Sequence, residues 1–300
     1  FYIYLFGKDN SMKLGFLTPY SEEIVQFAGD DPNFECLEFS GPPAEWVGDT
    51  DEAHTARESA LKLLNTNGLS ISSFLTNWPS IRTPSAELPA YLDHFSKIFD
   101  VCQAMGDNVV LAGAGPMGYD PSVSLEDNVA CYKEVYTPIG NLAEAKGVLI
   151  GFENWPGGGG PFSDGGNLSV TPEAWGLMFD AVPSKAIGLE FDPSHLIWQG
   201  IDSFEAFEEF SDRVNILHAK DTEIFEDRLK RVGVFRRGGW WRYRLPGFAD
   251  FNWPQFFALV HEHGFDESVV IEHEDAVFSG NRRLEGFTRC GIYLSNCILG

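Results

Sequence analysis

The sequence predicts a single (β/α)₈ barrel, the TIM barrel fold. Three observations support this prediction: eight short apolar runs can be found, longer amphipathic segments separate them, and 300 residues is an ordinary length for one such barrel. Most of the runs are apolar at successive positions, which is typical of parallel strands covered on both faces. No linker or change of composition divides residues 12–300, so we expect them to form one domain.

Each predicted strand alternates with a segment that favours a helix. The strands are expected at Lys13–Leu17, Cys36–Phe39, Leu69–Phe74, Asn108–Ala112, Val148–Glu153, Ile187–Asp192, Val214–Lys220 and Ser268–Glu272. The helices are expected at Ala53–Asn65, Leu88–Met105, Leu125–Lys146, a segment starting at Thr171–Glu173, Ser203–Phe210, Pro254–His263 and Arg282–Ile298. Thr171 supplies a capping hydroxyl, and Pro172 fits the first helical position.

The main competing fold is a doubly wound open sheet. That fold usually has a glycine-rich phosphate turn after its first strand, and Leu17–Tyr20 at this position contains no glycine. The run Gly157–Gly160 is not followed by Lys and then Ser or Thr, and it does not open a helix. We therefore interpret it as a flexible loop.

The composition narrows the class of protein and its partners. A net charge of -23 repels phosphate backbones and anionic membranes, so the sequence argues against nucleic acid and membrane partners. Five cysteines without CxxC spacing predict reduced thiols in a cytoplasmic protein. No apolar run reaches the length of a membrane span. Residues 1–11 are interpreted as an expression-derived or leader segment ahead of Met12.

Four predicted strands in the second half of the chain end in a carboxylate or an imidazole. These side chains are Glu153, Asp192, His218 and Glu272. The carboxyl ends of barrel strands meet at one face, where active sites of this fold lie. A charge placed there is costly unless it is paired or ligated. We therefore expect the four side chains to converge on one divalent metal ion.

Three oxygen ligands and one nitrogen ligand suit a fairly hard divalent ion. The sequence favours Mn²⁺ as the cofactor, with Mg²⁺, Co²⁺, Zn²⁺ or Fe²⁺ as alternatives. The competing interpretation is that these are ordinary polar residues facing solvent. It would explain one such position, but it fits poorly when four successive strands end in this way.

Five segments resemble the sugar phosphate isomerase/epimerase family of xylose-isomerase-like barrels. They are Gly151–Asn154, Phe191–His195, His218–Asp221, Arg244–Gly247 and Ile271–Asp275. The resemblance is specific in residues 148–275 and general in residues 12–147. It implies a metal site at Glu153, Asp192, His218 and Glu272. In the ketose 3-epimerases of this superfamily the two glutamates also move protons on opposite faces of the substrate, and the histidine at the position of His195 supports the substrate or the metal ligands.

The same residues make chemical sense in a sugar isomerase or epimerase. A proton next to a carbonyl is weakly acidic, and a bound metal would stabilise the enediolate that forms when this proton leaves. A carboxylate within hydrogen-bonding reach can remove the proton, a role that we expect Glu153 and Glu272 to share. Return of the proton from the opposite face gives an epimer, and return to the neighbouring carbon exchanges an aldose and a ketose. We therefore expect a sugar, keto-sugar or polyol as the small-molecule substrate.

Two alternative functions stay open. A lyase or dehydratase, for example one that eliminates the aglycone of a keto-glycoside, would use the same metal and base. A catalytically inactive, sugar-binding barrel would keep the ligands without turnover. DNA repair of the endonuclease IV kind is disfavoured, because the strand ends near Thr76 and Gly113 carry none of the additional histidines of that branch.

A long insertion, Thr222–Asn252, precedes the eighth predicted strand. It holds seven of the 21 basic residues and a cluster of aromatic side chains. An arginine near this point contacts substrate in ketose epimerases, and the sequence leaves Arg242 and Arg244 equally eligible. The insertion could instead fold on itself or form a contact in a homo-oligomer.

Further substrate contacts are expected from the residues next to the predicted ligands. His195 follows Asp192 by three positions, and we expect it to contact substrate or a ligand. Trp155 and Trp78 could form walls of the pocket, since aromatic faces stack on the apolar faces of sugar rings. Lys220 and Asp221 could bind substrate hydroxyls or pair with each other, and the sequence does not decide between these roles.

Overall fold

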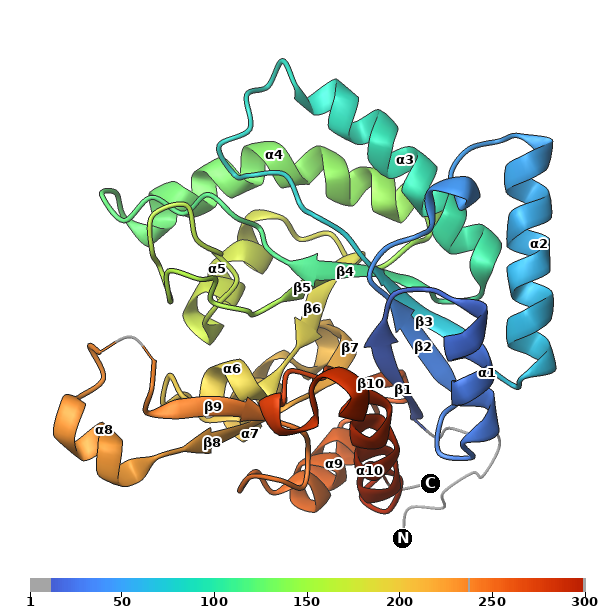
Figure 1. Cartoon of the computed structure of the whole chain (residues 1–300). Coiled ribbons are helices and arrows are strands. Elements are labelled where there is room, and N and C mark those ends of the chain that lie inside the picture. The colour runs from blue at the N-terminus through green and yellow to red at the C-terminus, as the bar shows by residue number, and fades with distance from the viewer. Residues whose placement is uncertain (1–11, 237, 299–300) are drawn as a thin grey trace, which may run out of the picture.

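Residues 12–236 and 238–298 are described by the computed structural model. Within them, eight parallel strands form a closed barrel in the order β1-β10-β7-β6-β5-β4-β3-β2 (Figure 1). The barrel strands are β1 (Lys13–Thr18), β2 (Cys36–Phe39), β3 (Ser70–Leu75), β4 (Val110–Ala114), β5 (Ile150–Glu153), β6 (Ile187–Phe191), β7 (Val214–Ala219) and β10 (Ser268–Ile271). The predicted barrel and all eight predicted strands are confirmed.

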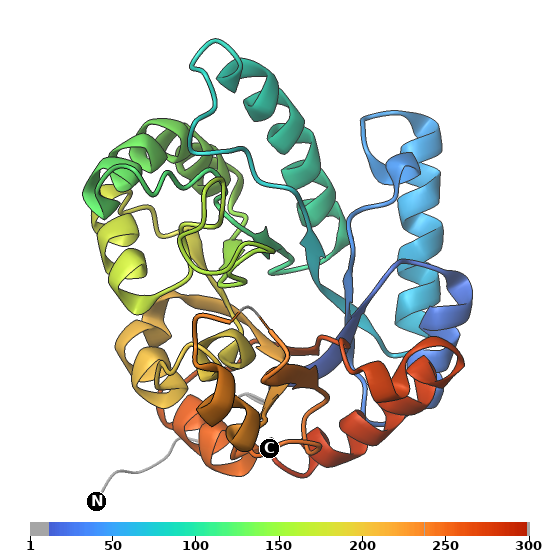
Figure 2. The ribbon, with the colours of Figure 1, turned by 60° about the vertical axis from the view of Figure 1, so that its left-hand side comes forward.

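The described residues form ten α-helices, most of which surround the strands on the outside of the barrel (Figure 2). They are α1 (Glu22–Asp30), α2 (Asp51–Thr66), α3 (Leu88–Met105), α4 (Leu125–Lys146), α5 (Pro172–Ala181), α6 (Pro193–Ile197), α7 (Ser203–Phe210), α8 (Glu226–Val232), α9 (Trp253–Glu262) and α10 (Arg283–Ser295). The connections also hold four short 3₁₀ helices, η1 (Ala44–Trp46), η2 (Ser211–Arg213), η3 (Ala276–Phe278) and η4 (Gly280–Arg282). Among the described helices, none combines the length and the apolar character that crossing a membrane requires.

Capping side chains fix where several helices begin. Thr171 accepts a hydrogen bond from the backbone N–H of Ala174, and Pro172 occupies the first turn of α5, as predicted. Ser21 caps α1 in the same way by accepting from Ile24 N. Each predicted helix is present, whereas α1, α6 and α8 were not predicted. The start signal of α1 is nevertheless visible in the sequence, since Ser21 precedes two acidic residues in the first turn.

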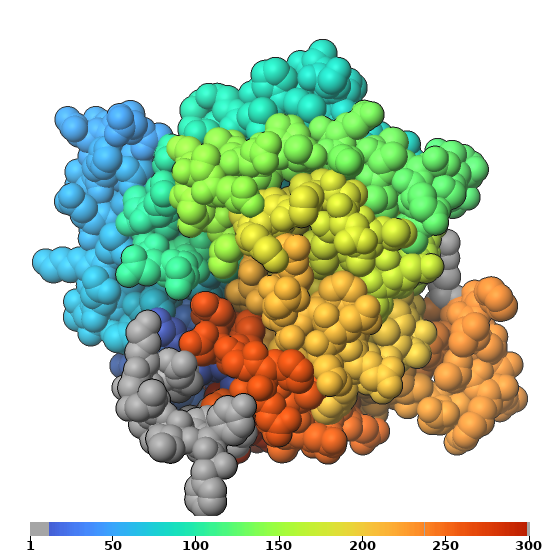
Figure 3. Space-filling view, turned by 180° about the vertical axis from the view of Figure 1, so that it is seen from behind, coloured from blue at the N-terminus to red at the C-terminus, as the bar shows by residue number. Residues whose placement is uncertain are grey.

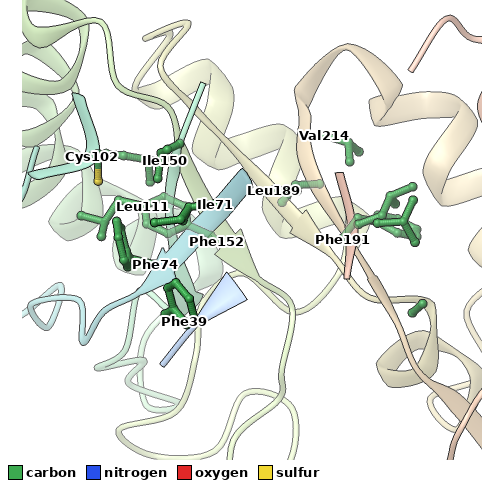
Figure 4. Close-up of a cluster of buried hydrophobic side chains, with 14 of the residues drawn as sticks. Phe39, Ile71, Phe74, Cys102, Leu111, Ile150, Phe152, Leu189, Phe191 and Val214 are labelled. Carbon is green, nitrogen blue, oxygen red and sulfur yellow. The ribbon is translucent and has the colours of Figure 1, made fainter. Parts of the chain in front are cut away.

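Alternate side chains along the barrel strands belong to two different hydrophobic clusters. Leu111 and Leu217 belong to the large cluster that the strands share with the helices, part of which Figure 4 shows. A smaller cluster consists of Val110, Ala112, Ile216 and Val270. Because successive side chains on a strand point to opposite faces, this smaller cluster lies inside the barrel. His218 and Glu272 share the parity of Ile216 and Val270, so both side chains also point inward.

The insertion between the seventh and eighth barrel strands forms a structure of its own. It contains β8 (Asp221–Ile224), α8 and β9 (Trp241–Arg244), and the two strands pair antiparallel with Thr222 opposite Tyr243. The segment projects to one side of the barrel, as Figure 1 and the view from behind in Figure 3 show. The predicted long insertion is confirmed, with α8 and the hairpin as structure that the sequence analysis did not anticipate.

Candidate metal centre

The structure brings the four predicted ligands together. Glu153 ends β5, Asp192 follows β6, His218 lies near the end of β7, and Glu272 follows β10. Each offers one ligand atom, and these four atoms all lie within 4.8 Å of one another. Glu153, Asp192 and His218 are buried, while Glu272 is partly exposed. The convergence expected from the strand ends is therefore present in the fold.

The ring of His218 is oriented by a carboxylate on β2, a strand separated from β7 by β1 and β10. Its Nε2 lies 2.7 Å from Glu38 Oε2 and 2.9 Å from Glu190 Oε1. Its Nδ1 faces the other ligands, at 3.3 Å from Glu272 Oε2 and 3.6 Å from Glu153 Oε1. A proton on Nε2 that is donated to Glu38 leaves the lone pair of Nδ1 directed toward the four-residue cluster, as a metal ligand requires.

The donor set fits a divalent cation. Among the described residues, His218 Nδ1 and Asp192 Oδ2 are buried atoms without a hydrogen-bond partner. Buried polar atoms are normally satisfied, and although the Lys220 ammonium lies 3.2 Å from Asp192 Oδ2, His218 Nδ1 faces three carboxylates with its lone pair unused, which a cation would satisfy. Three carboxylates and one imidazole nitrogen are ligands that Mn²⁺, Zn²⁺ and related ions accept in proteins.

Two asparagines fix the backbone at the ends of β5 and β6. Asn154 accepts from the backbone N–H of Asp192 at 2.8 Å and donates to its carbonyl at 2.9 Å. Asn167 donates to the carbonyls of Glu153 and Trp155, each at 2.8 Å. These bonds hold Glu153 and Asp192 in register with each other and set the position of Trp155.

His195 links the metal centre to the insertion. Its ring is fully buried, with Nε2 at 3.1 Å from Glu153 Oε1 and Nδ1 at 2.7 Å from the hydroxyl of Tyr243. The expectation for His195 included contact with a ligand, and the structure shows that contact with Glu153. Tyr243 was not predicted as a site residue.

Lys220 is a buried ammonium group beside the ligands. Its Nζ donates to Glu272 and, at 2.9 Å, to Glu274, and it lies 3.2 Å from Asp192 Oδ2. It also lies 4.5 Å from the centre of the Tyr243 ring. Lys220 therefore pairs with three carboxylates around the candidate metal site, rather than with Asp221.

The neighbours of the two glutamates keep both of them ionised. Burial would raise the pKa of Glu153, but hydrogen bonds from His195 and His218 hold this pKa well below its usual range. Burial acts in the same direction on Glu272, and the Lys220 ammonium outweighs it and lowers the pKa. Both groups are therefore carboxylates at neutral pH, the form that a ligand or a general base needs.

Three predicted substrate residues do not reach the metal centre. Asp221 turns away from it and accepts hydrogen bonds from Thr222 N and, at 3.3 Å, from the indole of Trp253. Arg242 pairs with Glu223, and Arg244 pairs with Glu223 and Asp275. The physical reason is strand parity: the side chain of Tyr243 points to the face opposite those of its two neighbours.

A cavity of about 730 Å³ adjoins the ligands. Glu153, His218, Glu272 and Trp155 line one side of it. The first half of the chain also contributes to the lining, and its residues there include Thr76, Trp78, His94 and Gly113. Trp155 and Trp78 are thus placed as pocket walls, in the position that the sequence analysis considered for them. A ring of the size of a sugar or cyclic polyol fits a cavity of this volume.

Sequence reasoning missed Glu38, Glu190 and Tyr243. Glu38 and Glu190 each interrupt an apolar strand with a fully buried carboxyl group, and such a residue is costly without a partner. That interruption was a signal in the sequence. Tyr243 gave no comparable signal, because aromatic residues are abundant throughout the insertion.

Comparison with known proteins agrees with this architecture. The inosose dehydratase of Clostridium perfringens is 23% identical over 219 residues, which are 68% of this chain and 67% of that enzyme. The probable 3-DHS dehydratase of Bacillus anthracis superposes with a TM-score of 0.70 at 17% identity, covering 95% of this chain and 99% of that one. The IOLI protein, whose crystal structure holds a zinc atom, superposes with a TM-score of 0.69 at 15% identity over 96% and 100% of the two chains.

The family assignment depends on the greater part of the sequence. The model of the xylose isomerase-like TIM barrel family matches residues 30–286. This range includes seven of the eight barrel strands and all four candidate ligands. It also confirms the resemblance drawn from the motifs around Glu153, Asp192, His218 and Glu272. The chain therefore belongs to the xylose isomerase-like TIM barrel family.

Proposed function

We propose that this protein is a metal-dependent lyase that eliminates water or another β-substituent from a keto-sugar or keto-polyol. The observation that carries the proposal is the cluster of Glu153, Asp192, His218 and Glu272, whose ligand atoms lie within 4.8 Å of one another beside a cavity. The dehydratase names of two relatives favour elimination over the isomerase or epimerase activity that the sequence predicted first.

Glu153, Asp192, His218 and Glu272 would hold the metal. A divalent ion bound there supplies positive charge that stabilises the negative charge developing on a substrate carbonyl oxygen. The zinc atom of the IOLI protein supports Zn²⁺ as one candidate beside Mn²⁺. Glu38 keeps the His218 ring in the orientation that this binding needs.

Carboxylates that line the cavity would carry out the proton transfer. One of them, for which Glu153 is the stronger candidate because His195 holds it in place, removes the proton next to the carbonyl. The electrons of that C–H bond form a carbon–carbon double bond, and the C–O bond to the β-substituent breaks. The leaving oxygen keeps its electron pair and takes up a proton, so that water departs and the base is regenerated.

The test separates elimination from epimerisation. Protein stripped with EDTA and reloaded with Zn²⁺ or Mn²⁺ is incubated with an inosose in heavy water, and the product is examined by mass spectrometry. Elimination gives a product lighter by one water molecule, and the reaction requires the metal. A product of unchanged formula that carries solvent deuterium would instead identify an epimerase or isomerase.

Two variants test the carboxylates. Glu153→Gln and Glu272→Gln are each expected to lower turnover roughly 10²–10⁴-fold, which is the usual contribution of a general base. Glu262→Gln, an exposed position on α9, serves as the control and should keep full activity. Full activity of both site variants with metal bound would refute the assignment of these two residues.

A further inference from the structure

An aromatic cavity lies next to the metal cavity. It has a volume of about 430 Å³ and lies between the loop that contains Gly157–Gly160 and the insertion. Its aromatic lining consists of Trp155, Trp198, Phe235, Trp240, Trp241 and Tyr243. Trp155 lines both cavities, so the aromatic cavity and the cavity of the candidate metal site adjoin at this residue.

Stacked rings give the aromatic cavity a firm wall. The indoles of Trp198 and Trp241 stack with ring centres 4.8 Å apart and an interplanar angle of 4°. Trp241 in turn contacts the Tyr243 ring at 4.7 Å. The Tyr243 hydroxyl lies 2.7 Å from His195 Nδ1, and His195 contacts Glu153. The wall is therefore continuous with the group that we propose as the base.

The glycine loop leaves room opposite this wall. A Cβ atom added at Gly157, Gly158 or Gly160 would meet no heavy atom within 4 Å. Gly157 and Gly160 have φ values of +80° and +88°, which non-glycine residues rarely adopt. The loop thus presents bare backbone to the cavity, and a planar group can lie between it and the indoles. The run Gly157–Gly160, which lacks the features of a phosphate-binding loop, thereby gains a role as one wall of the aromatic cavity.

The charges of the residues that line the aromatic cavity indicate what kind of chemical group can bind in it. Among the described residues that line the aromatic cavity, Arg236 is the charged one and no carboxylate occurs. This absence is notable in a chain with a net charge of -23. The lining therefore suits a flat ring that is neutral or carries negative charge, such as a phenol or phenolate.

We propose that the aromatic cavity binds the aromatic aglycone of an aryl keto-glycoside whose sugar ring occupies the metal cavity. This inference depends on the proposed function and names its substrate class. The eliminated β-substituent is then the aglycone oxygen: the C–H bond next to the carbonyl and the C–O bond to the aglycone break, a carbon–carbon double bond forms, and the phenol leaves with the proton.

The first experiment measures binding without turnover. The full chain loaded with Zn²⁺ is titrated with 4-nitrophenyl β-glucoside and with methyl β-glucoside, both unoxidised, by isothermal titration calorimetry. The aryl glycoside should bind about tenfold more tightly, in line with the energy of stacking a ring on aromatic side chains. Equal affinities for the two glycosides would overturn the proposal.

Two variants locate the binding. Trp241→Ala should reduce affinity for the aryl glycoside about tenfold and leave that for the methyl glycoside within twofold. Gly158 lines the aromatic cavity and a Cβ atom there would meet no heavy atom within 4 Å, so Gly158→Leu removes no packing and should block the aryl glycoside alone even if Trp241→Ala folds poorly. Aryl affinity that is unchanged in Gly158→Leu would contradict the cavity as the binding site.

The remaining outcomes separate this inference from the proposed function. Selective aryl binding without metal-dependent turnover of the 3-keto derivatives would refute the lyase and keep the binding site. Turnover of methyl and aryl 3-keto-glucosides with equal kcat/KM would keep the lyase and refute the aglycone site.

Phe235 is 98% exposed at the cavity. A dimer that Phe235→Ser dissociates, with aryl binding appearing only in that monomer, would identify the cavity as an interface between copies and overturn the proposal.

Discussion

The two halves of the barrel contribute different chemistry to the same cavity. The ends of β5, β6, β7 and β10 supply Glu153, Asp192, His218 and Glu272, three acids and one imidazole. The ends of β2, β3 and β4 supply neutral groups, among them Ser40, Leu75, Thr76, Gly113 and Ala114. The candidate metal ligands therefore all come from one half, while the strand ends of the other half give the cavity a neutral lining. The candidate metal ligands thus lie in the second half of the chain, while residues of both halves shape the pocket.

Glu38 is the exception to this division. It lies on β2, yet its carboxylate reaches across the barrel interior to His218 Nε2 at 2.7 Å. The first half therefore also supports the metal centre, through a residue that touches a ligand and not the metal site. Three predictions test how sharply the halves differ.

The largest effect is expected from removing a ligand in the second half. Asp192→Asn keeps the oxygen that caps α6 by accepting from Ser194 N, but it loses the negative charge. We expect the affinity for Zn²⁺ to fall by more than about 100-fold, beyond the usual effect of a residue that only supports a ligand. Calorimetric titration and metal analysis of the purified protein measure this loss.

The matched variant in the first half is Thr76→Val, which keeps the shape of the side chain. It should bind Zn²⁺ within twofold of the original protein and alter only KM for the substrate, because Thr76 lines the cavity without belonging to the ligand cluster. A loss of metal affinity equal to that of Asp192→Asn would show that the division between the halves is wrong.

A smaller effect is expected at Glu38. Glu38→Leu removes the acceptor for His218 Nε2, and we expect metal affinity to drop about 10- to 100-fold, as when other carboxylate partners of metal-bound histidines are removed. Glu38→Gln can still accept that hydrogen bond through its amide oxygen, so it should retain more affinity. If the leucine variant binds metal normally, Glu38 does not position His218.

The smallest effect concerns Asp221, an acid of the second half that lies outside the ligand cluster. Burial raises its pKa from 3.8 to about 6. The folded state therefore binds a proton more readily than the unfolded state between these values, and this group's contribution to stability falls as the pH rises from about 4 to 6.

The measurement compares Asp221→Asn with the original protein in denaturant titrations at pH 4 and pH 7, both in EDTA. Between the two pH values, the difference in unfolding free energy should change by about 2 kcal/mol in favour of the asparagine variant. Any hydrogen bond lost in the variant is absent at both pH values and cancels. A difference that does not depend on pH would place the Asp221 carboxyl in contact with solvent.

Much of the fold and part of the site could be predicted because their signals are local. Each of these signals lies within a short stretch of consecutive residues. The apolar runs predicted all eight barrel strands, and helix periodicity and the cap at Thr171 predicted helices. The four candidate ligands followed from one rule, that polar residues at the ends of parallel barrel strands meet at one face. The helices α1 and α8 were not predicted although α1 carries the same kind of local cap.

The sequence by itself therefore determined the barrel, the insertion and the convergence of Glu153, Asp192, His218 and Glu272. Only the tertiary structure decided that Glu38 reaches His218, 180 residues away in the chain, because β2 and β7, which have β1 and β10 between them, come within reach of each other only once the barrel has closed. It also decided that Tyr243, not Arg242 or Arg244, turns toward His195. A shift of one residue in a β-hairpin exchanges its two faces, and the pairing of Thr222 with Tyr243 fixes that register through contacts that no local pattern encodes.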